Sequence, residues 1–290
     1  MKTLLMTDSC SDLPIEYTKE NDIFVFPLTY HFKGEDHVDD FGTTLSYSDF
    51  YAEVRKGEMS STSQVNTYTF KETFKKFIDQ GYSLVYIAFS SALSGTYNNA
   101  MLAKEEIIAE NPTADISVID SRCASMGLGL LVFTACQKLM AGMAKEDLVA
   151  WIEANKLKLN HWFTVDDLFH LKRGGRVSAT SAVIGSLLDI KPILHVDDEG
   201  RLIPVAKTKG RKKSIRTLAN ELNDRITNAE DQFIAISHGD CYEDAKLLEK
   251  LILEQHKVKG FIINYVGPVV GSHSGPGTMA LFFFGENRHI

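Results

Sequence analysis

Short apolar runs alternate along the first half of the chain with longer stretches that repeat apolar residues every three or four positions. The apolar runs predict buried strands at 4–7, 23–32, 83–90 and 115–120. The periodic stretches predict helices at 14–21, 67–80, from about Ser94 to 110, and at 125–142. Strands that alternate with helices and are apolar on both faces are typical of a parallel sheet with helices on both sides.

The pattern changes after a predicted helix at 145–157. Two strand-like stretches, 160–168 and 191–208, follow, and the second contains the hairpin signal Asp198-Glu199-Gly200. Helices are then predicted at 213–226 and 242–255, with strands at 233–237 and 260–266. We therefore expect two α/β domains, residues 1–158 and 159–290.

Composition narrows the class of protein. The chain has 290 residues, 44% of them hydrophobic and 24% charged, which suits a folded core. A net charge of −7 argues against nucleic-acid binding, which depends on contacts to phosphates. Cys10, Cys123, Cys136 and Cys241 form no CxxC or zinc-finger spacing, as expected for a reduced protein. With no apolar run long enough for a signal peptide or a membrane span, we expect a soluble, cytoplasmic protein.

Four segments carry candidate chemistry. The hydroxyl-rich segment 60–66 precedes a helix and is also typical of helix capping. Ser94 and Gly95 follow a buried strand at the start of a helix, where backbone N–H groups favour an anion. Arg173 and Arg176 flank two glycines, a pattern that also fits a solvated turn. His273 lies in a glycine- and proline-rich stretch that we expect to be a loop, directly before the apolar run 279–284.

A run of basic residues stands out in this acidic chain, and it is a candidate docking patch or simply a solvated helix start. It comprises Lys207, Lys209, Arg211, Lys212 and Lys213. The sequence has no GxxxxGK[ST], GxGxxG, HExxH or GxSxG motif. Taken alone, the residues indicate an α/β binding protein or enzyme with an anion site.

Seven segments together resemble the DegV family over nearly the whole chain. They are TDSCSDLP (7–14), TSQ (62–64), SSALSGTYNNA (90–100), DSRCASMGLG (120–129), LKRGGRVS (171–178), IKPIL (190–194) and GPVVGSHSGPGTMALFFFG (267–285). The resemblance implies a parallel sheet with flanking helices in the first domain, a mixed sheet in the second, and a ligand tunnel between them. It also implies a fatty-acid-binding subunit that presents an acyl carboxylate to a separate ATP-using kinase, and then holds the acyl phosphate for phospholipid synthesis.

The resemblance assigns roles to single residues. Thr62, Ser94 and His273 are expected to hold the carboxylate, with the backbone N–H near Gly95 beside them. Arg173, Arg176, Lys207 and Arg211 are candidate contacts to the kinase. We expect a non-catalytic carrier with no metal and no cofactor, a long-chain fatty acid such as palmitate as ligand, and at most transient contact with a membrane.

Two positions depart from the family pattern. Val65-Asn66 stands where a proline is expected, and Cys10 stands where a hydroxyl residue is common. The apolar residues Leu187, Leu188, Ile190, Ile193 and 279–284 are suitable for a tunnel wall, although core positions explain them equally well.

Two other hypotheses stay open. One is an acyl-ester hydrolase that uses Ser94 as nucleophile and His273 as base, which the missing GxSxG motif disfavours. The other is a regulatory nucleic-acid-binding protein that uses the basic run, which the acidic net charge disfavours.

Overall fold

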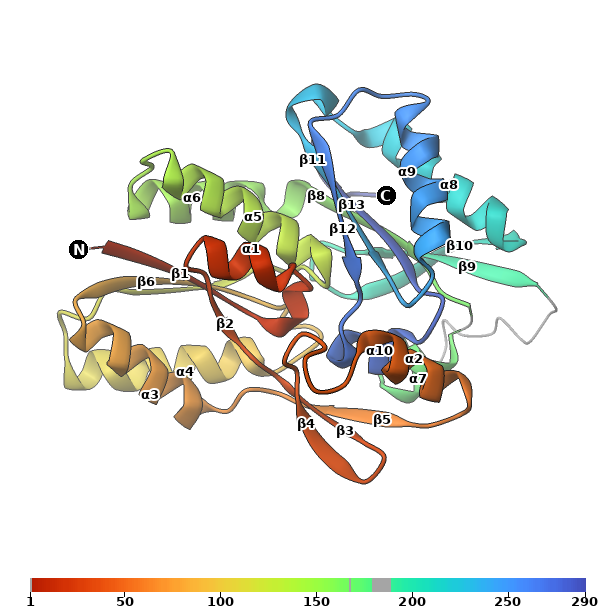
Figure 1. Ribbon diagram of the computed structural model, residues 1–290. Coiled ribbons are helices and arrows are strands. Elements are labelled where there is room, and N and C mark those ends of the chain that lie inside the picture. The colour runs from red at the N-terminus through yellow and green to blue at the C-terminus, as the bar shows by residue number, and fades with distance from the viewer. Residues whose placement is uncertain (1, 167, 179–188) are drawn as a thin grey trace.

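The computed structural model describes residues 2–166, 168–178 and 189–290, whose strands form three sheets (Figure 1). The first sheet is parallel, in the order β2 (Phe24–Phe26), β1 (Lys2–Asp8), β6 (Tyr82–Ala88), β7 (Ile116–Asp120). A small antiparallel sheet has the order β4 (Glu35–Val38), β3 (Thr29–Phe32), β5 (Ser60–Ser63). The third sheet is mixed, in the order β10 (Leu202–Lys209), β9 (Ile190–Val196), β8 (Leu159–Thr164), β13 (Met279–Phe284), β11 (Phe233–His238), β12 (Gly260–Tyr265).

Helices cover both faces of the parallel sheet, as the unbroken apolar strands predict. In Figure 1, α3 (Thr67–Asp79) and α4 (Thr96–Glu110) lie below the sheet. Above it lie α1 (Ile15–Glu20), α5 (Met126–Met140) and α6 (Lys145–Asn155). The predicted parallel sheet with flanking helices is therefore confirmed.

Helix α5 lies between the parallel sheet and the mixed sheet (Figure 1). Ten of its fifteen residues are buried, so it is apolar on nearly all sides. A helix of this kind has to be covered from more than one direction. The main core accordingly contains side chains from both sheets, such as Met6 of β1 and Phe282 of β13.

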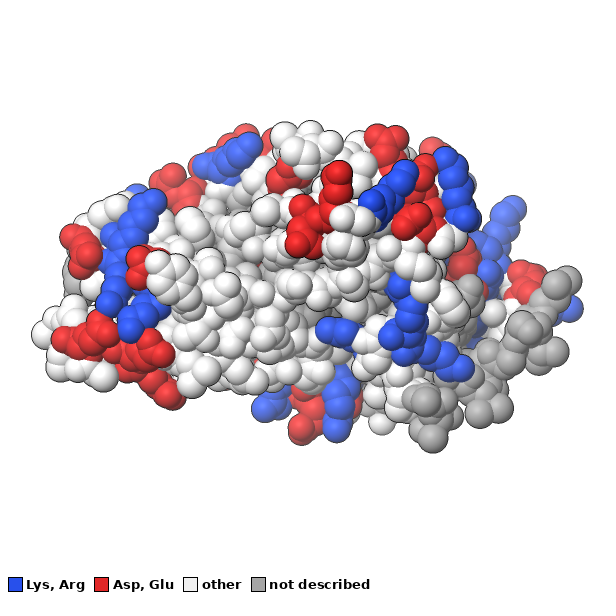
Figure 2. All heavy atoms as spheres, turned by 90° about the horizontal axis from the view of Figure 1, so that it is seen from below, with Lys and Arg blue, Asp and Glu red and all other residues white. Residues whose placement is uncertain are grey.

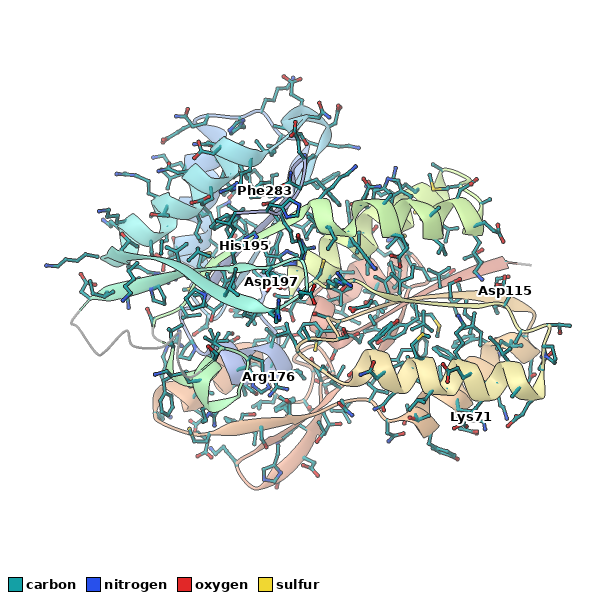
Figure 3. The ribbon with its side chains drawn as sticks, turned by 180° about the vertical axis from the view of Figure 1, so that it is seen from behind. Lys71, Asp115, Arg176, His195, Asp197 and Phe283 are labelled. Atoms are coloured by element: carbon teal, nitrogen blue, oxygen red, sulfur yellow. The ribbon has the colours of Figure 1, made fainter. Side chains whose placement is uncertain are left out.

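The mixed sheet has a second core on its other face, under α8 (Arg211–Arg225) and α9 (Tyr242–Leu253). Strand β13 serves both cores because successive side chains of a strand point to opposite faces. Ala280 and Phe282 belong to the main core, whereas Met279, Leu281 and Phe283 belong to the second. Figure 3 shows Phe283 on the side of α8 and α9.

The structure corrects several local predictions. The predicted strand 23–32 is two strands in two different sheets, because Pro27 interrupts it. The stretch around His273 is not a loop but α10 (Pro268–Ser274), and part of the segment 60–66 is β5. The pattern also missed α2 (Tyr47–Arg55), β4, α7 (Phe169–Arg173) and the short helices η1 (Ser9–Ser11), η2 (Lys156–Lys158) and η4 (Ala229–Asp231).

Strand β8 begins at Leu159, and the mixed sheet takes all its strands from that point onward. The division into domains 1–158 and 159–290 stays a prediction, since the two halves share the main core. Across the described residues, no helix combines the length and the apolar character that crossing a membrane requires.

Candidate functional site

A cavity of about 590 Å³ lies where the parallel sheet, the small sheet and the mixed sheet meet. Most of its inner wall is apolar, with side chains that include Leu28, Phe89, Phe163, Val266, Val269 and Phe282. This volume falls within the range of ordinary small-molecule sites. An apolar wall of this kind suits a hydrocarbon.

Thr62, Ser94, Gly95 and His273 all line this cavity, although they are far apart in the sequence. Thr62 lies on β5, Ser94 and Gly95 lie between β6 and α4, and His273 lies in the last turn of α10. The Thr62 Oγ1 and His273 Nε2 atoms are 2.8 Å apart and share a hydrogen bond. The fold therefore brings together the four residues that were predicted to hold the carboxylate.

The start of helix α4 provides donors for an anion. Gly95 is the N-cap, and the first turn of the helix contains no acidic side chain. Ser94 Oγ accepts a hydrogen bond from the Thr96 N–H at 3.3 Å and lies 2.9 Å from Thr96 Oγ1. Because β6 runs parallel to its neighbours, this helix start is at the carboxyl end of the strands, where ligands bind in α/β sheets.

The His273 ring is held from several sides. Arg173 Nη2 donates to the carbonyl oxygen of Ser272 at 2.9 Å, and Ser272 Oγ donates to Ser60 Oγ on β5 at 2.7 Å. Gly174 packs directly on the imidazole, since a Cβ atom at position 174 would lie 2.2 Å from His273 Nδ1. The glycine at position 174 is therefore required by close approach to the ring.

The His273 ring is neutral at pH 7. Burial, together with the smaller effect of the positive charges of Arg176 and Arg173, lowers its pKa to about 4. Nδ1 is buried without a hydrogen-bond partner among the described residues, whereas Nε2 bonds to Thr62. The ring thus contributes one hydrogen bond to the site through Thr62.

The four predicted kinase-facing residues lie in different surroundings. Arg176 lines the cavity beside α10 (Figure 3) and donates through Nε to the Leu93 carbonyl oxygen at 3.2 Å. Arg173 and Lys207 are exposed and do not line the cavity. Arg211 forms an ion pair with Asp244 at 2.8 Å. The face in Figure 2 carries both signs of charge, and much of its centre is uncharged.

Two polar side chains of the lining, His161 and Ser125, are bonded within the protein, whereas the buried Ser274 Oγ has no hydrogen-bond partner among the described residues. His161 bonds through Nδ1 to the Leu159 carbonyl oxygen at 3.0 Å, and its Nε2 accepts from the Ala124 N–H at 3.3 Å. Ser125 Oγ bonds to the Asp12 carboxyl group and to Ser237. The His161 and Ser125 side chains therefore have little hydrogen-bonding capacity left for a ligand, and their presence is compatible with a wall that contacts a hydrocarbon chain.

The candidate tunnel residues are only partly found in the wall. Ala280 and Phe282 line the cavity, as the run 279–284 allowed, but Ile193 belongs to the second core and Ile190 is not part of the lining. Leu187 and Leu188 lie outside the described residues. Cys10, which departs from the family pattern, lines the cavity.

Sequence reasoning missed the two neighbours of Thr62. Ser63 and Gln64 line the cavity, and both side chains are exposed. Their place next to Thr62 in the TSQ segment was the available signal. His161 and Ser125 were missed as well; Ser125 lies in the family segment 120–129, which was a signal, whereas His161 lies outside the seven segments.

The hydrolase hypothesis finds no Ser–His pair between its two proposed residues. His273 Nε2 bonds to Thr62, and Ser94 Oγ bonds to Thr96. A serine nucleophile needs its base within hydrogen-bond reach. Over the stretches that the structure describes, no three His, Cys, Asp or Glu side chains are grouped to hold a metal ion.

Comparison with known proteins agrees with the geometry. The DegV family, described as "Uncharacterised protein, DegV family", matches residues 2–286. A DegV domain-containing protein of Clostridium perfringens, CPE0026, is 48% identical over 287 residues, which are 99% of each chain.

Solved structures of the same kind share the fold. A DegV family protein from Thermus thermophilus, described for its fatty acid binding, superposes with a TM-score of 0.89 at 27% identity, over 98% of this chain and 100% of that one. DegV of Bacillus subtilis, described as a fatty acid binding protein, gives 0.84 at 29% identity, over 99% and 100%. The α/β fold class expected from the resemblance, with a parallel sheet and a mixed sheet, matches these structures, and the present chain belongs to the DegV family.

Proposed function

We propose that this protein binds one long-chain fatty acid, such as palmitate, in the cavity, with the tail against the apolar wall. The carboxylate lies between Thr62 and Ser94, close to the backbone N–H groups at Gly95 and to His273. The observation that carries the proposal is one cavity that is apolar within and has these four residues in its lining. Relatives described as fatty acid binding proteins support the same ligand class.

The energetics favour such an amphiphile. Burying the tail contributes roughly 0.8 kcal/mol per methylene, so a sixteen-carbon acid gains on the order of 10 kcal/mol before association costs. A buried carboxylate without partners would be very costly, so the head needs several donors. Affinity then comes mainly from the tail, and the head group sets the orientation.

The neutral His273 imidazole determines which way the Thr62 hydroxyl donates its hydrogen bond. For the Thr62 hydroxyl to donate to a carboxylate, its oxygen has to accept a hydrogen bond from His273 Nε2–H. The pKa of about 4 keeps this ring uncharged, so that only one of its nitrogens carries hydrogen. In this arrangement His273 acts through Thr62, and its buried Nδ1 is an acceptor without a donor among the described residues.

The carrier does not catalyse a reaction by itself in this proposal. A separate kinase transfers the terminal phosphoryl group of ATP to a carboxylate oxygen, which gives an acyl phosphate and ADP. Arg173, Arg176, Lys207 and Arg211 are the candidate kinase contacts. The exposed Ser63 and Gln64 beside Thr62 support access to the head group from outside.

The test is titration of the delipidated protein with palmitate, followed by incubation of the complex with a purified fatty acid kinase subunit and ATP. We expect saturable binding of one palmitate per chain and acyl phosphate only when both proteins are present. Thr62→Val and Ser94→Ala should each weaken binding about tenfold, since each removes a hydrogen bond to a charged group. Unsaturable uptake of palmitate, or phosphorylation without this protein, would contradict the proposal.

A further inference from the structure

Gln64 has a free side-chain amide at the exposed part of the cavity lining. The side chain is exposed and lines the cavity, and its amide has no hydrogen-bond partner among the residues that the structure describes. An amide carries two N–H donors and a carbonyl acceptor. These groups are therefore available to a ligand.

The fold keeps room for this amide. A Cβ atom at Gly95 would lie 2.4 Å from Gln64 Oε1 and 3.0 Å from Gln64 Nε2. Gly95 has a negative φ of −75° with ψ 3°, so its backbone does not require glycine. The short distances show instead that the Gln64 amide lies against Gly95 at the start of α4, and that an alanine at position 95 would push the amide aside.

The position of the Gln64 amide indicates which part of a ligand it would contact. Thr62 and Ser94 are half-buried, whereas Gln64 is exposed. When the carboxyl carbon is fixed between the two hydroxyl groups, a group attached to its outer oxygen projects toward this exposed part of the lining. A phosphoryl group placed there would meet the Gln64 N–H groups and the start of α4, which favours anions.

We propose that Gln64 is a further binding residue, one that recognises the phosphoryl group of an acyl phosphate and contributes little to the binding of the free acid. This inference rests on the proposed function. A neutral amide suits the role because its two N–H groups can donate hydrogen bonds to a dianionic product without adding a fixed charge to the site. Gln64 thus lets one site hold two successive head groups.

The experiment compares two ligands on delipidated protein by calorimetric titration. One ligand is palmitate, and the other is its 2-oxoalkyl phosphonate analogue, in which a methylene replaces the bridging oxygen of the acyl phosphate. Gln64→Ala should weaken the phosphonate about tenfold, as loss of a hydrogen bond to a charged group does, and change palmitate affinity less than about twofold. Gln64→Glu should weaken the phosphonate further through repulsion.

Two controls sharpen the result. Gln255→Ala removes another exposed glutamine that does not line the cavity, and it should change neither affinity. Gly95→Ala displaces the Gln64 amide, so it should also weaken the phosphonate. The double variant, Gln64→Ala with Gly95→Ala, should then bind the phosphonate no more weakly than Gly95→Ala alone, because both changes remove the same contact.

The possible outcomes separate this inference from the proposed function. If the wild-type protein binds no palmitate, the proposed function itself fails. If the wild-type protein binds palmitate but Gln64→Ala binds the phosphonate as tightly as wild type, or weakens both ligands equally, the inference about Gln64 is wrong. Inorganic phosphate alone should bind to neither the wild-type protein nor Gln64→Ala, since the acyl chain is needed to hold the phosphoryl group in the site.

Discussion

At the scale of single residues, the head-group site depends on how the His273 ring is held. The ring meets Thr62 at one nitrogen and has the backbone of Gly174 against the other. Arg173 fixes the preceding residue by its bond to the Ser272 carbonyl oxygen. A change of less than an ångström in the ring position would lengthen the 2.8 Å bond to Thr62, so this arrangement is sensitive to small substitutions.

Gly174→Ala tests this packing. The added methyl group would overlap His273 Nδ1, so the ring has to move and Thr62 loses its donor. We expect palmitate affinity to fall about tenfold, the effect of one lost hydrogen bond to a charged group. Titration with palmitate measures it.

Gly175→Ala is the matched control for that variant. Gly175 has φ +71°, and a Cβ atom added there would meet open space, so alanine strains the backbone without touching the ring. Its stability should fall by about 1–2 kcal/mol while its palmitate affinity stays unchanged. Equal loss of affinity in both variants would show that the ring contact is not the cause.

The charge state of His273 gives a second prediction. Its pKa of about 4 lies below the ordinary value of 6.5, so the unfolded chain binds a proton that the folded chain does not. The contribution of the neutral ring to stability is present above pH 6.5 and is lost as pH falls toward 4. Proton NMR of the ring should show titration near pH 4 in the ligand-free protein. Titration near 6.5 would contradict a buried, neutral imidazole.

At the scale of elements, the periodic and apolar patterns predicted the strands of the parallel sheet and the helices α8 and α9, because both rest on repeated burial of one face. Helix α10 was not predicted, since it is short and its glycine and two serines are weaker helix formers than alanine or leucine. Its ends nevertheless carry the usual signals, with Pro268 at the first turn and Gly275 at φ +80° after the last. The sequence pattern singled out Ser94, Gly95 and His273 separately, but their joint role came from the family resemblance, because their side chains meet only in the folded chain.

Tertiary contacts stabilise α10, whose residues have little intrinsic tendency to form a helix. Asp12 Oδ1 accepts a hydrogen bond from the Gly267 N–H at 2.9 Å, at the N-cap of the helix, and its other oxygen bonds to Ser125. Tyr51 OH donates to the Val266 carbonyl oxygen at 2.7 Å. Bonds between residues more than two hundred positions apart cannot be deduced from a local pattern.

Asp12→Ala should therefore destabilise the protein by about 2–4 kcal/mol, because it leaves the buried Gly267 N–H and the Ser125 hydroxyl without this acceptor. Asp12→Asn should lose less, since its amide oxygen still accepts from Gly267. Urea unfolding measures both variants. Asp79→Ala, at the end of α3, should be nearly neutral, and an Asp12→Ala effect as small as that would refute the anchoring role.

At the scale of the whole molecule, hydrogen bonds join the two halves of the chain. Ser90 Oγ donates to the Gly200 carbonyl oxygen at 2.9 Å, and Arg122 donates to that of Asp198 at 2.8 Å. Near the C-terminus, Arg288 is 1% exposed and donates to the Arg122 carbonyl oxygen at 2.7 Å. The cavity thus forms only in the complete fold, and a ligand that fills it should stabilise the whole protein.

Ligand binding to the folded state alone raises the free energy of unfolding by about 2.7 kcal/mol when the free ligand is one hundred times Kd. Urea unfolding of delipidated protein with palmitate should show an increase of this size. Methyl palmitate, which lacks the anionic head, should stabilise less at the same concentration. Equal stabilisation by the ester would mean that the four head-group residues do not hold a carboxylate.

The central claim is that the cavity holds a fatty acid, and the most direct measurement is mass spectrometry of the organic extract from the purified protein. We predict one long-chain fatty acid per protein chain in the extract, and its replacement by added palmitate. An extract without fatty acid, from a protein that also takes up no palmitate, would contradict the account.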